Sequence, residues 1–241
     1  HTLTTDKVMT SKVRAINDSY HGILFQKINA IEGNFLTLSR NDRERLFKDT
    51  ELIMDFSTSI AVERKLADEE HTFRRCTSFL NPKGDDVVLL IEDKDRNSRL
   101  DLLEMDYYRN LIVDERFALH LEQSGTVRTN TFSCRSESMI LNYENVRVLS
   151  AIISKQIRKY YTLGQACLSI WHFDAEKGTV SSLPMTITNW HHEVLGDIQV
   201  YISDAVEKEI QTMTFTSPNK ETGGCLFGSY DRDHNSIYVY Y

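Results

Sequence analysis

Glycine and proline are scarce in this chain, whose 241 residues include 10 glycines and 3 prolines. Long flexible or proline-rich linkers are therefore not expected. Long apolar runs are also missing, since none approaches the roughly 18 residues that a membrane-spanning helix needs. The sequence thus predicts a folded protein with no membrane partner.

Paired cysteines and an excess of basic residues are missing as well. The four cysteines show no C-x-x-C spacing, which predicts free thiols in the reducing cytoplasm. The net charge of −7 offers no broad positive field to nucleic acid. Hydrophobic residues make up 41% and charged residues 26% of the chain, as in an ordinary globular protein of one large or two small domains.

The first half alternates strand-like and helix-like segments, which indicates a parallel sheet with crossover helices. Helices are expected over 10–20, 41–47, 59–68, 100–121, 144–160 and 203–212. Strands are expected over 22–28, 34–38, 51–56, 73–80, 86–91, 167–173, 179–187 and 197–202. From residue 165 to 189 the pattern changes to short alternating strands. A domain boundary is expected after this segment, between Trp190 and Gly196.

Near the C-terminal end, a carboxylate precedes a glycine pair in Lys220-Glu221-Thr222-Gly223-Gly224-Cys225-Leu226-Phe227-Gly228. Glycines without side chains allow two backbones to approach closely, and an apolar strand is expected to follow. Glu221, at the lip of that strand, would serve as general base for a metal-bound water. The alternative is a solvated carboxylate in a turn.

This segment resembles the opening of JAB/MPN (JAMM-type) zinc isopeptidase domains, which begin with Glu-x-Gly-Gly-x-Leu-x-Gly. The resemblance implies a Zn²⁺-dependent peptidase or deconjugase with Glu221 as a catalytic residue. The His-x-His and the later Ser and Asp that hold zinc in that family are not in this chain. We therefore assign no metal ligand here. His191-His192 suggest a metal, but neighbouring residues on a strand point to opposite faces.

A second resemblance lies in the first half, in His1-Thr2-Leu3, Lys12 and Leu52-Ile53-Met54-Asp55-Phe56-Ser57-Thr58. These segments look like the distal half of the ThiF/E1 adenylating domain, which activates ubiquitin-like proteins with ATP and Mg²⁺. The resemblance implies that Lys12 contacts the ATP phosphates and that Asp55 helps to place Mg-ATP. A solvated helix lysine and a helix N-cap are the alternatives for these two residues.

The chemistry of adenylation fits such residues, because a carboxylate attacks the α-phosphate and two anions must approach each other. A lysine and a metal ion neutralise the developing charge, and ligands bind at the carboxyl ends of parallel strands. The chain departs from the family in having Met9-Thr10 where Val-Gly is frequent, and it contains no Gly-x-Gly-x-x-Gly. We expect that phosphate loop upstream, in a longer polypeptide of which this chain is a piece.

Cys134 is the best thiol candidate, in Phe132-Ser133-Cys134-Arg135-Ser136. E1 enzymes pass the activated carrier to a cysteine as a thioester, and a neighbouring cation such as Arg135 lowers a thiol pKa. A small, partly buried residue is an equally good interpretation of Cys134. The other cysteines, Cys76, Cys167 and Cys225, are expected to be packing residues.

The sequence therefore predicts an α/β fold in two parts. Residues 1–190 would form the distal part of a Rossmann-like E1 adenylation fold, and residues 191–241 would begin an α+β JAB-like domain. The implied function is ATP-dependent activation of a ubiquitin-like protein, coupled to a JAMM-type deconjugase, as in bacterial systems of antiviral defence. The implied partners are a ubiquitin-like protein, an E2-like protein and a second copy of the chain. The alternatives are a non-catalytic E1-like scaffold and a sulfur-carrier activating enzyme.

Overall fold

The computed structural model describes residues 33–57, 59–70, 72–122, 142–218 and 220–241, together with two short strands near the N-terminus. The chain divides into two compact units, His1–Lys48 and Asp49–Tyr241. In the first unit, β1 (Thr2–Leu3) pairs antiparallel with β2 (Met9–Thr10). The 3-10 helix η1 (Phe35–Thr37) and α2 (Arg40–Phe47) follow.

Local capping decides the conformation of residues 34–47. The strand expected over 34–38 is wrong, because the Asn34 side chain accepts a hydrogen bond from the Leu36 N–H and turns the chain into η1. The helix expected over 41–47 is confirmed as α2. Its N-cap is Ser39, whose hydroxyl accepts from the Asp42 N–H at 3.2 Å, as the sequence indicates.

The second unit is mixed α/β and contains a five-stranded sheet in the order β3-β4-β5-β6-β7. The strands are β3 (Leu52–Asp55), β4 (Arg74–Leu80), β5 (Asp86–Ile91), β6 (Cys167–Asp174) and β7 (Thr179–Pro184). Only β3 and β4 pair in parallel, while the three other pairs are antiparallel. The expected parallel sheet is therefore wrong for most of these strands, because a tight turn between β4 and β5 reverses the chain without a crossover helix.

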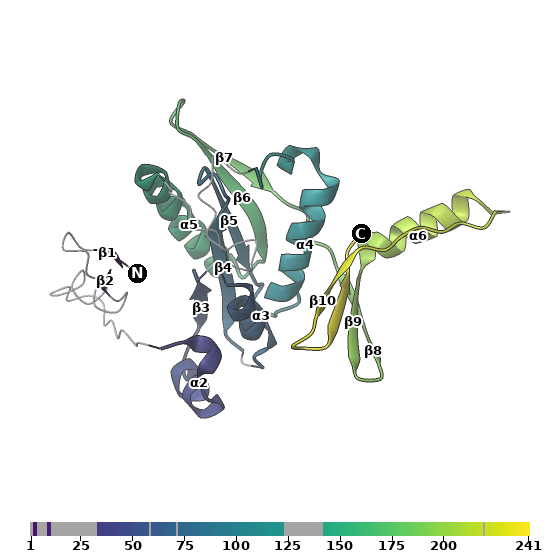
Figure 1. Cartoon of the computed structure of the whole chain (residues 1–241), viewed down its shortest axis with the longest axis horizontal. Coiled ribbons are helices and arrows are strands. Elements are labelled where there is room, and N and C mark those ends of the chain that lie inside the picture. The colour runs from purple at the N-terminus through teal and green to yellow at the C-terminus, as the bar shows by residue number, and fades with distance from the viewer. Residues whose placement is uncertain are drawn as a thin grey trace. The chain divides into compact units, whose positions relative to one another are not determined.

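Helices cover both faces of this sheet (Figure 1). α5 (Tyr143–Leu163) packs on one face through Leu149, Ile153 and Ile157. α3 (Ile60–Asp68) and α4 (Leu100–Val113) lie on the other face. Successive side chains of β5 alternate between the two cores, with Val88 and Leu90 on the α4 side and Leu89 and Ile91 on the α5 side. The continuous apolar run of β5 thus reflects burial on both faces.

A second sheet of four strands has the order β10-β11-β9-β8. The strands are β8 (Trp190–Leu195), β9 (Ile198–Ser203), β10 (Gly228–Asp231) and β11 (Ser236–Val239), and α6 (Asp204–Thr216) follows β9. β9 and β11 pair in parallel. β8 occupies the residues where a domain boundary is expected, so the second sheet begins at Trp190.

The helix α4 is buried against both sheets. Leu100 and Leu103 belong to the core of the first sheet, whereas Leu102 and Met105 pack with Tyr201 and Tyr238 of the second sheet. The helix expected over 100–121 ends at Val113, and the 3-10 helix η2 (Glu115–Phe117) follows after Asp114. Within the described residues, no helix is both long enough and apolar enough to cross a bilayer.

Two buried arginines at the start of β4 connect this end of the sheet to the neighbouring helix ends. Arg74 donates to the carbonyls of Tyr160 and Tyr161, in the last turn of α5, where a cation complements the helix dipole. Arg75 pairs with Glu92 at 3.3 Å, and both side chains are fully buried. Glu92 also accepts from the Leu100 N–H at 3.0 Å and thereby caps α4.

Gly228 provides a first test of the packing of the second sheet. A Cβ at this position would lie 2.2 Å from the Tyr238 carbonyl oxygen, whereas a Cβ at Gly224 would meet no atom within 4 Å. We expect Gly228→Ala to destabilise the protein by about 1–3 kcal/mol, as overpacking does. Gly224→Ala serves as the control and should leave the melting temperature near that of wild type. Equal melting temperatures for both variants would contradict this assignment.

Asp106 of α4 provides a test of pH dependence. Burial raises the pKa of Asp106 to about 6 from its usual 3.8, against the lowering effect of hydrogen bonds from Thr188. Because the folded state holds this proton more tightly, the stabilisation is present below the usual pKa and is lost as the pH rises through about 6. The loss amounts to about 3 kcal/mol.

Urea unfolding of wild type and Asp106→Asn between pH 4 and 7 measures this contribution. The free energy of unfolding of wild type should fall relative to that of the variant as the pH rises. Parallel curves for the two proteins would show that Asp106 does not titrate in this range.

Candidate functional site

Asp55 lies at the carboxyl end of β3, where the sequence places an ATP-site acid. Its side chain is buried, with a relative exposure of 5%. Oδ1 accepts from the Ser57 N–H at 2.8 Å. Oδ2 is also buried but has no hydrogen-bond partner among the described residues. A buried carboxylate oxygen without a donor is costly, so this atom is a candidate ligand for a cation.

The alternative role of Asp55 as a helix cap does not fit the structure. α3 begins at Ile60, and its N-cap is Ser59. Asp55 is four residues earlier and turns the chain locally through Ser57. Its neighbour across the parallel pair is Thr77 of β4, whose hydroxyl donates to the Asp55 main-chain oxygen at 3.3 Å. The strand end is therefore fixed in place, and Asp55 Oδ2 has no hydrogen-bond partner in the described part of the chain.

Two other predicted site residues, Lys12 and Cys134, lie outside the described residues, as does Arg135. Among the remaining cysteines, Cys76 and Cys167 pack in the core on the α5 side of the first sheet. Burial raises the pKa of the Cys76 thiol to about 12, which makes it a poor nucleophile. Cys225 is exposed, so the expectation that it is a packing residue is wrong within the described structure.

Glu221 is exposed and lies in an irregular segment before β10. The expected strand after the glycine pair is wrong, because β10 begins only at Gly228. The close backbone approach expected at Gly223-Gly224 is wrong too, since an added Cβ would meet nothing within 4 Å at either residue. Gly228 is instead the glycine at which a neighbouring backbone, that of Tyr238, leaves no room for a side chain.

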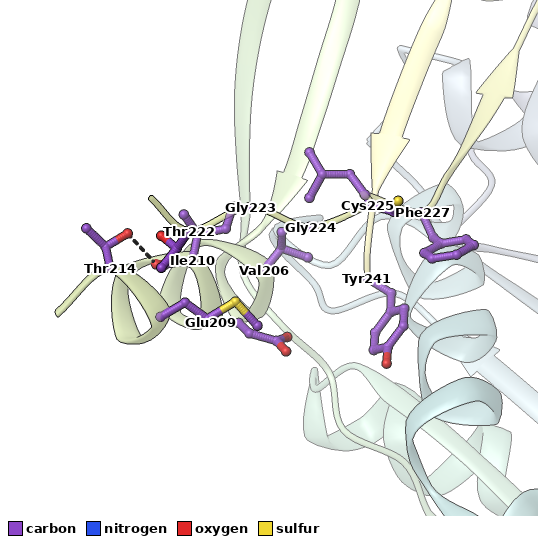
Figure 2. Close-up of a pocket in the computed structure, with 12 residues that line it drawn as sticks. Val206, Glu209, Ile210, Thr214, Thr222, Gly223, Gly224, Cys225, Phe227 and Tyr241 are labelled. Atoms are coloured by element: carbon purple, nitrogen blue, oxygen red, sulfur yellow. Dashed lines mark hydrogen bonds between the residues drawn. The ribbon is translucent and has the colours of Figure 1, made fainter. Parts of the chain in front are cut away.

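A groove runs along this segment, and Figure 2 shows the residues that line it. Its volume is about 520 Å³. One wall is α6, with Val206, Ile210 and Met213, and the other wall is the chain from Thr222 to Phe227. Tyr241 lies beside Phe227, with ring centroids 5.9 Å apart. The groove is mainly apolar, and its polar side chains are Glu209, Thr214, Thr222 and Tyr241. Glu221 directly precedes the lining segment and is not part of the lining.

A smaller polar pocket of about 270 Å³ lies where α3 and α4 meet the second sheet. Arg99 forms a two-pronged ion pair with Asp101 at 3.0 and 2.8 Å, and Asp101 also accepts from the Tyr238 hydroxyl at 2.9 Å. Arg64 pairs with Glu104 at 3.1 Å. Because both guanidinium groups are already paired with carboxylates, we interpret this pocket as a structural contact between the two sheets.

Asp231 and His234 complete the same pocket, with a distance of 2.8 Å between Oδ2 and Nδ1. Burial raises the pKa of Asp231, but His234 and Arg64 outweigh this effect and hold it below its usual value. Asp231 is therefore a stable carboxylate that joins α3 to the second sheet, since its Oδ2 also lies 3.9 Å from Arg64.

The two adjacent histidines of β8 contact different residues. His191 Nε2 lies 3.2 Å from Glu207 of α6. His192 bonds to Gln199 at 2.6 Å and stacks on Tyr201 of the neighbouring strand. The two side chains therefore do not share a ligand site, as the alternation of strand residues predicts.

A polar network that the sequence does not reveal lies at the start of β5. The carboxylate of Asp86 bonds to two imidazoles, His120 Nδ1 at 2.6 Å and His172 Nδ1 at 2.7 Å. Tyr107 bonds to the other nitrogen of His120 at 3.1 Å. The register of β5 and β6 places Asp86 opposite His172. Because the partners are 34 and 86 residues apart, no local spacing could have brought them together.

The chain matches no model of a known protein family, and no curated protein matches it. The geometry by itself defines a mixed α/β protein with helices on both faces of its larger sheet. It also supplies a buried strand-end carboxylate at Asp55 and an apolar groove beside the glycine pair.

Proposed function

We propose that this chain is the distal part of an E1-like adenylating domain joined to the start of a JAMM-like zinc hydrolase domain. The observation that supports the first part best is Asp55, buried at the end of β3 with Oδ2 unpaired among the described residues. A carboxylate at the carboxyl end of a parallel strand is positioned to meet a ligand at that edge of a sheet. The parallel pairing of β3 with β4 places Asp55 at such an edge.

In this proposal the reaction is the attack of a carrier's C-terminal carboxylate on the α-phosphate of ATP. Asp55 would hold Mg²⁺ through Oδ2 while Oδ1 stays on the Ser57 N–H. Mg²⁺ prefers oxygen ligands and is usually held by one or two carboxylates together with phosphate oxygens. A single free carboxylate oxygen, already rigidly placed, matches that requirement. Lys12 would contact the phosphates.

The second part of the proposal concerns Glu221 and zinc. Glu221 is exposed, so its carboxylate is accessible to a metal-bound water, as a general base must be. Catalytic zinc needs three protein ligands, and in this proposal Glu221 is not one of them. Cleavage of a precursor or conjugate of the carrier would follow from a water activated by zinc and Glu221.

The non-catalytic scaffold differs from an activating enzyme in one measurable respect. An adenylating enzyme exchanges pyrophosphate into ATP when its carrier is present, whereas a docking module only binds the carrier. Activation of a sulfur carrier would give the same exchange with a different protein substrate. Pyrophosphate exchange by the intact polypeptide therefore separates catalysis from docking, and the carrier that supports it separates the two enzymatic alternatives.

Asp55→Asn tests the adenylation site. The amide keeps the acceptor for the Ser57 N–H but removes the charge, so we expect a native melting temperature and a loss of pyrophosphate exchange. Loss of one group that stabilises charge in the transition state costs about 2.7–4 kcal/mol, on the order of a hundredfold or more in rate. Asp95→Asn, at an exposed acid, is the control. Exchange by Asp55→Asn at the wild-type rate would refute the assignment.

Glu221→Gln tests the hydrolase in the intact polypeptide. As a general base outside the zinc coordination shell, Glu221 should be dispensable for zinc binding and required for cleavage of a carrier fusion. We expect zinc content equal to that of wild type and cleavage reduced about 10²-fold or more. Glu209→Gln, on the wall of the groove, should keep both properties. Loss of zinc would make Glu221 a ligand, and retained cleavage would remove it from the mechanism.

A further inference from the structure

The carboxylates of Asp85 and Asp86 lie next to the imidazole of His172 at the end of the β5–β6 pair. One ligand atom from each residue lies within 4.8 Å of the other two. It is the one group of three such residues that meets this test in the described part of the chain. Two carboxylates and an imidazole are a ligand set for a divalent first-row transition ion.

The charge balance of this cluster favours a cation. Asp86 is buried at 7% exposure, and its ion-pair partners in the described structure are two histidines, which are charged only when protonated. Lys83, the nearby ammonium, donates to Glu122 at 2.6 Å and acts on Asp85 and Asp86 only through its electrostatic field. With neutral imidazoles, neither carboxylate would have a direct ion pair with a permanent cation among the described residues, which is unfavourable for the buried Asp86.

The surrounding hydrogen bonds hold the carboxylates in place before any ion arrives. The Asn81 side-chain oxygen accepts from the backbone N–H groups of Asp85 and Asp86 at 3.1 and 2.9 Å. The Asn81 amide donates to Asp85 Oδ1 at 2.7 Å. His120 holds the second oxygen of Asp86, Oδ2, at 2.6 Å. Such outer contacts orient metal-binding carboxylates and raise their affinity.

His172 leaves the site open on one side. Its side chain is 40% exposed, so an ion can enter from solvent and water can complete the coordination. His172 Nδ1 and Asp86 Oδ1 are hydrogen-bonded at 2.7 Å. A divalent ion at about 2.0–2.2 Å from each atom would replace this hydrogen bond, with a neutral imidazole as its ligand.

We propose that Asp85, Asp86 and His172 form a binding site for a divalent transition-metal ion, with Zn²⁺ or Co²⁺ as the probe. The site is distinct from the zinc centre inferred for Glu221 and does not depend on the proposed function. The bound ion would link the turn that precedes β5 to strand β6. The imidazole ligand disfavours Mg²⁺ and Ca²⁺, which prefer oxygen ligands alone.

The test is titration of the whole chain with Co²⁺, followed by its d–d absorption, and competition with Zn²⁺. We expect saturable binding of one ion per chain at this site and a rise in melting temperature with Zn²⁺. His172→Ala and Asp85→Ala should each weaken binding at least tenfold and abolish the melting shift. His192→Ala, which removes an exposed histidine of β8 that bonds to Gln199, is the matched control and should bind as wild type does.

Two outcomes would overturn the site. One is the absence of saturable Co²⁺ or Zn²⁺ binding at micromolar concentrations. The other is unchanged binding in the His172→Ala/Asp85→Ala double variant. Both side chains are partly exposed, so the variants should fold, and a metal-free melting temperature near that of wild type checks this. A substitution at Asp86 is avoided, because it would also break the buried bond to His120.

Discussion

The burial of α4 between two sheets is the constraint on which the second unit depends. Its apolar residues face two cores at once, so its acids are buried too, and each must have partners. Asp101 bonds to Arg99 and Tyr238, Glu104 to Arg64 and Tyr108, and Asp106 to Thr188. These contacts reach α3, β11 and the chain before β8. The polar face of α4 therefore fixes the second sheet relative to the first.

Because a buried charge needs a partner, the buried charged groups can be sorted by the partners they have. In the polar pocket, each lining arginine is paired with a carboxylate, so these charges hold neighbouring elements together. Glu92 is fully buried, yet Arg75, Arg96 and the first turn of α4 bind it, even though burial raises its pKa. Asp55 and Asp86 differ, because among the described residues Asp55 Oδ2 has no hydrogen-bond partner and the direct ion-pair partners of Asp86 are histidines. These two carboxylates are the ones for which we propose a bound cation.

Local pattern predicted the elements of the fold well and their partners poorly. The Ser39 cap, the helix before Asp68 and the buried run of β5 follow from capping rules and periodicity, and the structure has them. The sequence pattern does not reveal β8, because it is an exposed edge strand in which apolar and polar residues do not alternate. The resemblance to E1-like domains singles out Asp55 at the end of an apolar strand, and the structure adds its burial and an Oδ2 atom without a hydrogen-bond partner among the described residues. The roles of Asp55 and Glu221 remain predictions.

The sequence by itself determined where many of the described helices and strands form, because capping and side-chain periodicity act over a few residues. Only the tertiary structure decided the direction of strand pairing, the second core on α4 and the need for glycine at Gly228 rather than at the Gly223-Gly224 pair. It also decided the meeting of Asp86 with His172, 86 residues away. Periodicity reports that a face is buried but not which element covers it, and contacts between distant residues depend on that choice.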